Sequence, residues 1–347
     1  MTGIFPDDLK IAKVVPLHKK NDVNVMDNYR PVSLLPAISK IFEKVAHHQL
    51  YNYFKNKNLF YTGQYGFRDD HSTELAALEL VDRLNTDMDE KNIPIAIYMD
   101  LSKAFDTLDH SILIHKLGYY GIKGASLSWF ESYLSNRFQY VEIEKCKSNL
   151  LPLKTGVPQG SVLGPLLFLI YMNDIPNSSS LLKYILFADD TSLLDSIKLS
   201  ISPNYDSDIN SLNTELSKIY DWLAVNKLSL NVSKTKFMIF HHPMKRLPSD
   251  LFLEINNTPI ERVREFCFLG LNINENLTWK THINKISSKI SKYTGIIDKL
   301  KRFLPQNILR TSYCSLIQSQ LNYCILVWGF KCNRIEKTPK SIFYNFK

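Results

Sequence analysis

The chain has 347 residues, of which 45% are hydrophobic and 22% are charged, a composition that predicts a folded protein of two or three subdomains. Its 42 Lys and Arg outnumber 34 Asp and Glu, so the net charge is +8, which weakly favours a polyanionic partner. The cysteines are odd in number and form no Cys-x-x-Cys pair, which argues against a disulfide framework or a zinc knuckle (Cys146, Cys267, Cys314, Cys324 and Cys332).

The N-terminal segment predicts no export signal. It contains Asp7 and Asp8 and has no long apolar run, unlike a signal peptide. The most apolar stretch, residues 162–172, is interrupted by Gly164 and Pro165 and is too short to span a bilayer. We therefore expect a soluble, intracellular chain with no membrane partner, and no compact basic run decides between nucleus and cytoplasm.

A basic hairpin or loop is predicted near the N-terminus. Lys13, Lys19 and Lys20 surround a short apolar run, and a polar stretch over residues 21–28 follows. Pro31 excludes a helix through Arg30, because the residue before a proline disfavours the helical conformation.

Several helices are expected after this hairpin. Between Ser39 and about Phe54, apolar residues recur at roughly helical spacing, at positions 41, 42, 45, 50 and 54. A second helix is expected to begin at Ser72 or Thr73. Further helical stretches are predicted at residues 126–134 and 163–170, and the latter is expected to be buried because it is apolar on nearly all sides.

Strands alternate with these helices. Residues 93–101 alternate between two faces, with positions 95, 97 and 99 on one face, and this strand ends at Asp100. Residues 141–143 and 151–153 are expected to pair as short strands before the turn at 156–160. Residues 184–194 predict a hairpin of apolar strands with a polar tip at 188–191, and residues 237–240 and 252–255 also favour strands.

An amphipathic helix is predicted ahead of the last third of the chain, which is itself predicted to be helical and basic. An amphipathic stripe over residues 209–223 is expected to be capped by Ser207. Between Lys280 and Arg302 there are seven Lys or Arg against one acid, Asp298. Isoleucines at 283, 286 and 290 share one helical face, which leaves lysines at 285, 289 and 292 on the rest of the surface.

Asp100, Asp189 and Asp190 stand where apolar strands end. An Asp-Asp pair is common in solvated turns, but this pair interrupts strongly apolar sequence on both sides. Clustered carboxylates repel one another unless a cation neutralises them, and oxygen ligands with open positions suit Mg²⁺, with Mn²⁺ as a substitute. Two such ions about 4 Å apart can activate an attacking 3′-hydroxyl and stabilise a departing pyrophosphate. Alternation sends Asp189 and Asp190 to different faces, so we expect Asp189 to be the firmer ligand beside Asp100.

Seven short motifs follow one another along the chain, and each is weakly informative alone. They are Tyr-Arg-Pro-Val-Ser-Leu at 29–34, Gln-Tyr-Gly-Phe-Arg at 64–68 with Ser-Thr at 72–73, Asp-Leu-Ser-Lys-Ala-Phe-Asp at 100–106, Gly-Val-Pro-Gln-Gly-Ser at 156–161, Phe-Ala-Asp-Asp at 187–190, Asn-Val-Ser-Lys-Thr-Lys at 231–236 and Phe-Leu-Gly at 268–270. In this order they resemble the reverse transcriptase of non-LTR retrotransposons of the jockey and CR1 kind, over nearly the whole chain.

The resemblance implies an α+β fold, the right-hand polymerase of fingers, a palm with an antiparallel sheet and a helical thumb. It also implies an RNA template, a DNA primer or target, and dNTPs as partners. Residues 1–92 would be fingers that lack their N-terminal part, residues 93–270 the palm with an interposed fingers segment, and residues 271–347 the thumb with a shortened tail.

The resemblance assigns catalytic roles as well. Asp100 and Asp189 would hold both metal ions, Asp190 would complete the acidic tip, and Lys234 would protonate the leaving pyrophosphate. Phe105, five residues after Asp100, would exclude a ribose 2′-hydroxyl by steric clash, although a plain core position suits a Phe equally well.

The resemblance also assigns residues that would bind the substrates. Lys19 or Lys20, with Arg30, would hold the triphosphate, and Gln159 and Gly160 would lie beneath the nascent base pair. Phe268, Leu269 and Gly270 would form the primer grip, and Lys285, Lys289 and Lys292 would contact the duplex backbone. Simpler interpretations stay open for these residues. The cations could be solvated surface charges, the Gln-Gly pair an ordinary turn, and the basic helix a solvated amphipathic face.

Two departures leave alternatives for the function. Full proteins of this family carry an endonuclease and more fingers sequence upstream, and the tail after Gly329 drifts from the usual pattern, so the chain resembles a fragment of an element. An inactive nucleic-acid-binding remnant is therefore one alternative. An RNA-dependent RNA polymerase is the other, but those enzymes usually place an Asp where Phe105 stands. Oligomeric state and template specificity are not indicated.

Overall fold

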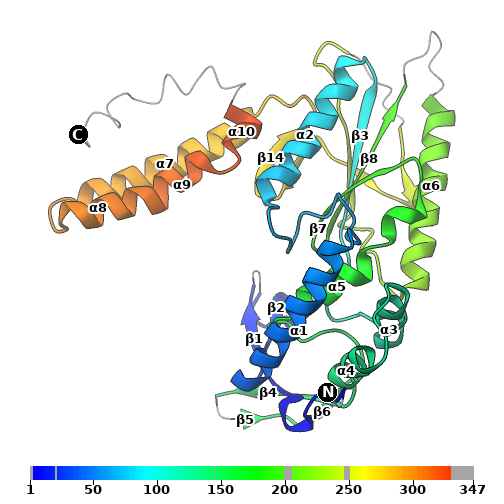
Figure 1. The fold of residues 1–347 in the computed structure, drawn as a ribbon. Helices are drawn as coiled ribbons and strands as arrows, with labels where there is room; N and C mark the ends of the chain where they lie inside the picture. The colour runs from blue at the N-terminus through cyan, green and yellow to red at the C-terminus, as the bar shows by residue number, and fades with distance from the viewer. Residues whose placement is uncertain (1–2, 20–21, 145, 199–204, 246–250, 330–347) are drawn as a thin grey trace.

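The computed structural model describes residues 3–19, 22–144, 146–198, 205–245 and 251–329, which form two five-stranded sheets, two small hairpins and a projecting set of helices (Figure 1). One five-stranded sheet, named the β3 sheet after its central strand, has the strand order β12-β9-β3-β8-β7. Its strands are β3 (Ile93–Met99), β7 (Lys183–Phe187), β8 (Asp190–Ile197), β9 (Lys236–Ile239) and β12 (Glu261–Arg262). Neighbouring strands are antiparallel except β9 and β12, which are parallel.

Strand β3 is buried along its whole length at the centre of this sheet. Ile95, Ile97 and Met99 enter one core with helix α6 (Tyr205–Val225), whereas Ala96 and Tyr98 enter a second core with helix α2 (Thr73–Asp89). The predicted alternation of this strand is therefore confirmed. The two helices lie on opposite faces of the sheet (Figure 1).

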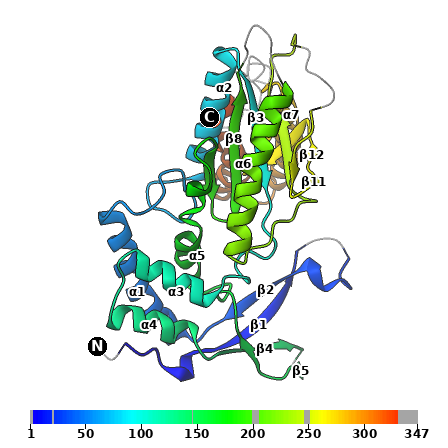
Figure 2. The ribbon, with the colours of Figure 1, turned by 90° about the vertical axis from the view of Figure 1, so that its right-hand side faces the viewer.

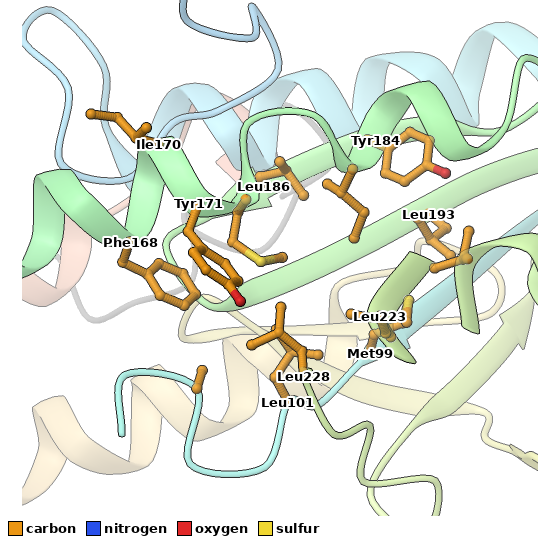
Figure 3. Packing of buried hydrophobic residues seen from close by; sticks show 14 of the residues in the cluster. Met99, Leu101, Phe168, Ile170, Tyr171, Tyr184, Leu186, Leu193, Leu223 and Leu228 are labelled. Atoms are coloured by element: carbon orange, nitrogen blue, oxygen red, sulfur yellow. The ribbon is translucent and has the colours of Figure 1, made fainter. Parts of the chain in front are cut away.

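Helix α2 begins as predicted. The Ser72 hydroxyl accepts a hydrogen bond from the Leu75 N–H at 3.2 Å, which satisfies one of the free amides of the first turn. Helix α5 (Gly164–Met172) is also confirmed, and eight of its residues are buried. Figure 3 shows Phe168 and Tyr171 of α5 in the core that also contains Leu101 and Leu228. Helix α3 (His110–Tyr119) packs against both α5 and α4 (Ala125–Leu134).

The other five-stranded sheet, named the β1 sheet, lies at the other end of the molecule (Figure 2). Its strands are β1 (Ile11–His18), β2 (Tyr29–Leu34), β4 (Arg137–Ile143), β5 (Cys146–Lys147) and β6 (Leu151–Leu153). Strands β1 and β2 form the predicted basic hairpin, with Leu17 opposite Arg30. Strand β1 also pairs in parallel with β4, from Ile11 opposite Phe138 to Val14 opposite Val141.

Helix α1 (Ala37–Asn56) confirms the predicted helix but buries only part of its apolar residues. Leu50 and Phe54 are buried, whereas Ile41 and Val45 are 63% and 55% exposed. The described part of the chain therefore leaves the N-terminal half of this helix largely uncovered. Short 3₁₀ turns precede β1 (Asp7–Leu9), lie between β1 and β2 (Met26–Asn28) and follow α5 (Ile175–Ser178).

Two small hairpins and four helices form the C-terminal part. The hairpins are β10 (Glu254–Ile255) with β11 (Thr258–Pro259), and β13 (Glu265–Phe268) with β14 (Leu271–Asn274). Helix α7 (Lys280–Leu300) packs against α8 (Gln306–Tyr313), a π-helical segment (Cys314–Gln318) and α9 (Ser319–Asn322) around Ile290, Ile297 and Ile317. This pair of rods projects away from the sheets (Figure 1), and α10 (Ile325–Trp328) follows it.

Three local predictions were wrong. Leu151–Leu153 pair with Arg137–Gln139, because the later part of β4 already pairs with β5. Ser207 does not cap α6, since the helix begins at Tyr205, whose ring packs against the core. In the segment 252–255, the strand is limited to Glu254–Ile255.

Neither membrane-spanning helices nor disulfide bonds are found among the described residues. Among the described helices, none is long and apolar enough to cross a bilayer. The four described cysteines are free, with Cys324 buried and Cys146, Cys267 and Cys314 exposed, whereas Cys332 lies outside the described residues.

Candidate active site

Asp100, Asp189 and Asp190 come together at one end of the β3 sheet. Asp189 lies in the two-residue loop between β7 and β8, since Phe187 pairs with Asp190. On the neighbouring strand Met99 pairs with Thr191, so Asp100, the next residue, is level with Asp190. Residues that face each other across antiparallel strands lie about 4.5–5.5 Å apart, which brings the carboxylates into electrostatic range.

The electrostatics of Asp190 reflect this crowding. Although the residue is at the exposed rim, the surrounding protein atoms partly desolvate its carboxyl group and raise its pKa to about 6. The negative charges of Asp189 and Asp100 raise the pKa further, and the positive charge of Lys19 opposes them. A cation between these carboxylates would relieve the repulsion.

The donor set fits a shared metal site better than a preformed cage. Within the described part of the chain, no three His, Cys, Asp or Glu side chains are grouped so that they could hold a metal ion. Mg²⁺ does not require such a group, because it binds through one or two carboxylates and completes its shell with waters and substrate phosphates. All-oxygen donors match that preference.

The segment that follows α6 holds Asp100 in place. The Asp100 carbonyl accepts the Asn231 N–H at 2.8 Å, and the Ser102 N–H donates to Ser229 at 2.8 Å. Thr235, which is fully buried, accepts the Asp100 N–H at 3.4 Å. Lys234 projects from the same turn, and its Nζ lies 3.7 Å from Oδ2 of Asp100, so an ion pair joins two of the predicted catalytic residues.

Phe105 and Gln159 lie on two loops that contact each other. The Phe105 ring stacks on Phe168 of α5 with 4.5 Å between centroids, and Phe105 remains partly exposed. Gln159 Nε2 donates to both carboxylate oxygens of Asp106, at 2.9 and 3.0 Å. Burial raises the pKa of Asp106, and the hydrogen bond from Gln159 partly opposes that rise.

Gly160 lies directly against strand β2. Its φ is +116°, and an added Cβ would come within 2.7 Å of the Ser33 carbonyl oxygen. The Ser33 N–H also donates to the Gln159 carbonyl at 2.7 Å. The glycine is therefore required by both its conformation and the close approach of strand β2.

The basic hairpin faces the carboxylates. The Lys19 N–H donates to the Asn28 carbonyl at 2.8 Å, and the positive charge of Lys19 acts to lower the pKa of Asp190. Arg30 is exposed on β2. Lys103, after β3, lies 3.4 Å from Asp27 near the tip of the hairpin, which links the two parts. Lys20 lies outside the described residues.

Phe268, Leu269 and Gly270 form the turn of the β13–β14 hairpin. Leu269 and Gly270 have φ of +44° and +85°, the pair of positive values typical of tight two-residue hairpin turns. Phe268 is buried near Tyr98, two residues before Asp100. The Tyr323 hydroxyl donates to the Leu269 carbonyl at 2.5 Å, so the helical part braces the turn.

The lysines of α7 share one exposed flank of the helix. Lys285, Lys289 and Lys292 are all exposed, but Lys285 Nζ also donates to Oδ1 of Asn272 at 2.5 Å. Lys285 and Lys289 line a cavity of about 640 Å³ between α7, α9 and the β13–β14 hairpin. These three side chains are free of ion pairs within the described part of the chain.

Glu43 is a buried residue to which the sequence assigned no role. Its carboxylate accepts the Val162 N–H at 2.6 Å, the Leu163 N–H at 3.3 Å and the Ser39 hydroxyl at 2.9 Å. It thereby fixes the two residues that directly precede α5. The signal in the sequence was an acid on the same helical face as Leu50.

Comparison with known proteins defines the class first. Residues 17–273 match the family described as reverse transcriptase (RNA-dependent DNA polymerase), and this range covers most of the chain. The chain therefore belongs to the reverse transcriptase family.

Relatives among retrotransposon polymerases are more particular. The chain is 26% identical over 342 residues to the RNA-directed DNA polymerase from mobile element jockey of Drosophila melanogaster, an alignment that covers 94% of this chain and 36% of that protein. The probable RNA-directed DNA polymerase from transposon X-element of the same organism is 26% identical over 354 residues, covering 97% of this chain and 37% of its own length. The predicted resemblance to non-LTR retrotransposon polymerases is confirmed, and the chain spans little more than a third of these relatives.

Solved structures support the fold. Telomerase from Candida tropicalis, in complex with a fragment of telomeric RNA, aligns with 97% of this chain and 56% of its own, with a TM-score of 0.53 and 13% identity. Telomerase from Candida albicans aligns with 93% of this chain and 61% of its own, with a TM-score of 0.51 and 12% identity. The predicted α+β right-hand polymerase fold is confirmed.

Proposed function

We propose that this chain is an RNA-directed DNA polymerase core, which copies an RNA template by adding dNTPs to the 3′-hydroxyl of a DNA primer. The observation that carries the proposal is the meeting of Asp100, Asp189 and Asp190 at the ends of adjacent strands, opposite the cation of Lys19. Membership of the reverse transcriptase family supports it.

The metal-binding roles follow from the donor set. Asp100 and Asp189 would hold two Mg²⁺ ions, or Mn²⁺, and Asp190 would complete the acidic tip. When bound, these ions would activate the 3′-hydroxyl and neutralise the pyrophosphate. Lys234, 3.7 Å from Asp100, would deliver a proton to the leaving group, while Lys19 and Arg30 would neutralise the triphosphate.

Sugar selection rests on Phe105. Its ring is held against Phe168, so it cannot easily yield to an additional 2′-oxygen. Asp106, the next residue along the chain, accepts both hydrogen bonds from Gln159. This arrangement favours a DNA-making enzyme over an RNA-dependent RNA polymerase, which needs a polar group that recognises the ribose.

The subdomain and nucleic-acid roles complete the proposal. Residues 1–92 would be fingers, residues 93–270 the palm with an interposed fingers segment, and residues 271–347 the thumb, of which residues 330–347 lie outside the description. Gln159 and Gly160 would lie beneath the nascent base pair, and residues 268–270 would hold the primer. The exposed lysines of α7 would contact the duplex backbone, where charge fixes position without reading sequence.

Primer extension tests this function. Purified protein with Mg²⁺, dNTPs and a DNA primer on an RNA template is expected to extend the primer. Asp189→Asn should reduce the rate by at least about 10²-fold, because an amide cannot replace a charged metal ligand. Asp221→Asn, at an exposed position of α6, is the matched control and should extend normally.

The inactive remnant is distinguished in the same assay. Binding of the primed duplex is measured in parallel by a mobility shift. Duplex binding without primer extension by the wild-type protein would contradict the polymerase function and identify the chain as an inactive nucleic-acid-binding remnant.

A further inference from the structure

The loop over residues 63–68 lies along the outer edge of β7, the strand that leads to Asp189. The Leu186 N–H donates to Gly63 at 2.8 Å, and the Tyr65 N–H donates back to Leu186 at 2.7 Å. Gln64 pairs with Leu186 as a single parallel bridge. The loop thus adds a single bridge to the outer edge of the β3 sheet, beside the acidic hairpin.

The side chain of Gln64 reaches from this loop into the hairpin turn. Gln64 is only 3% exposed, and its Oε1 accepts the Gly66 N–H at 2.8 Å and the Ala188 N–H at 3.2 Å. Both partners are donors, so the carbonyl oxygen of the amide must face them. Ala188 is the residue directly before Asp189.

Ala188 has a conformation that alanine seldom adopts. Its φ is +57°, in the left-handed region, and its side chain is 6% exposed. Residues held in such regions persist only when their surroundings fix them, and they cluster at functional sites.

Gly66 closes the other side of the turn. An added Cβ there would come within 2.3 Å of the Ala188 nitrogen and 3.0 Å of the Phe187 carbonyl carbon. Gly66 does not itself have a positive φ, so its lack of a side chain matters through space alone. The loop therefore both binds and encloses the backbone of Ala188.

We propose that Gln64 is a positioning residue that holds Ala188 in the left-handed conformation and thereby fixes the direction of the Asp189 carboxylate. Gln64 touches no reacting group and acts through the backbone of Ala188. Its catalytic consequence rests on the proposed polymerase function, whereas its effect on the turn does not.

Hydrogen exchange tests the effect on the turn without substrates. In Gln64→Met, which keeps the length of the side chain but loses the acceptor, the Ala188 amide should exchange roughly fivefold to tenfold faster than in the wild type. Exchange in β9 should be unchanged, which shows that the sheet is still folded. Gln49→Met, at an exposed position of α1, is the matched control and should not alter exchange at Ala188.

Primer extension tests the catalytic consequence. Gln64→Met should lower kcat by roughly 10- to 100-fold with little change in the KM for dNTP, because a misdirected metal ligand affects the chemical step. Gly66→Ala should have a similar effect through its contact with Ala188. Replacing Ala188 by Gly in the Gln64→Met background should recover most of kcat, since glycine adopts a positive φ without a hydrogen bond from its amide to Gln64.

Two results would overturn the proposal: unchanged exchange at Ala188 in Gln64→Met, or no recovery in the double variant. Unchanged exchange would show that Gln64 does not hold Ala188 in place. No recovery in the double variant would show that the loss of kcat in Gln64→Met does not act through Ala188. A wild-type protein that fails to extend a primer would contradict the polymerase function alone, because the exchange measurement would still decide the role of Gln64.

Discussion

Phe105 lies between the buried helix α5 and the loop that carries Gln159. Its ring lies flat on Phe168, which belongs to the buried helix α5, yet part of the ring remains exposed beside the loop that carries Gln159. Residue type could not decide between a core Phe and a gate, because both need a large apolar ring. The structure gives Phe105 a core contact on one face, and its role as a gate stays a prediction.

Phe105→Val tests this role. Removal of the ring should admit ribonucleotides, so that discrimination between dNTP and rNTP in kcat/KM falls by roughly 10- to 100-fold. Phe252→Val, at a site that is 68% exposed, should leave discrimination unchanged. Equal sugar selection in the wild type and Phe105→Val would remove Phe105 from the gate.

Glu43 is the residue whose loss should affect folding most directly. Its buried carboxylate accepts two backbone N–H groups at the start of α5, and Glu43→Ala would leave both without an acceptor. The free energy of unfolding should fall by about 3 kcal/mol, as measured by urea denaturation. Glu131→Ala, on the exposed side of α4, should change it by less than about 0.5 kcal/mol.

Elements with local signals were predictable. Helix α2 was found because Ser72 caps it and its leucines recur at helical spacing, both of which depend on residues a few positions apart. The faces of β3 were found for the same reason, since alternation along one strand decides them. Three carboxylates at strand ends were also visible in the sequence.

Contacts between distant segments were not predictable. The loop at 63–68 contains no strand pattern, yet it pairs with β7, more than a hundred residues later. The predicted pairing partner of Leu151–Leu153 was wrong because strand pairing depends on which strand edge is free in three dimensions. Gln64 belonged to a recognised motif, but its acceptor role exists only when Ala188 is beside it.

The β13–β14 hairpin and α7 meet at His282, which should make their packing sensitive to acid. His282 is 3% exposed, its Nδ1 accepts the Asn272 N–H at 3.3 Å, and its Nε2 has no hydrogen-bond partner among the described residues. Burial lowers its pKa to about 4 from 6.5, and Lys285 and Lys289 add to the effect.

The sign of the pH dependence follows. Between pH 4 and 6.5 the unfolded chain binds more protons at this site than the folded one, so stability is complete above pH 6.5 and falls as the pH decreases toward 4. The loss should reach roughly 2–3 kcal/mol. His282→Gln should flatten this part of the stability curve from urea unfolding, whereas the exposed His242→Gln should not. An unchanged slope in His282→Gln would contradict this assignment.

At the scale of the whole molecule, positive charge is unevenly distributed. The flank of α7 carries Lys285, Lys289 and Lys292, and this helix projects away from both sheets (Figure 1). Asp298, the one acid between Lys280 and Arg302, forms an ion pair with Lys301, separate from that flank.

Salt dependence of duplex binding measures this flank. For each phosphate contact, the slope of log K against log salt changes by about 0.9, so Lys289→Gln should reduce its magnitude by about one. Lys285→Gln should have a smaller effect because its ammonium is engaged by Asn272. Lys123→Gln, on the exposed loop between α3 and α4, should leave the slope unchanged, and an equal change there would show nonspecific attraction.

The parallel pairing of β1 with β4 has a consequence for synthesis on the ribosome. Strand β1 emerges well before its parallel partner at Phe138–Val141, which follows more than a hundred residues later. At ordinary rates of translation this leaves one edge of the nascent β1–β2 hairpin open for on the order of ten seconds. An open strand edge readily pairs with other chains, so the newborn protein should depend on chaperones until β4 arrives.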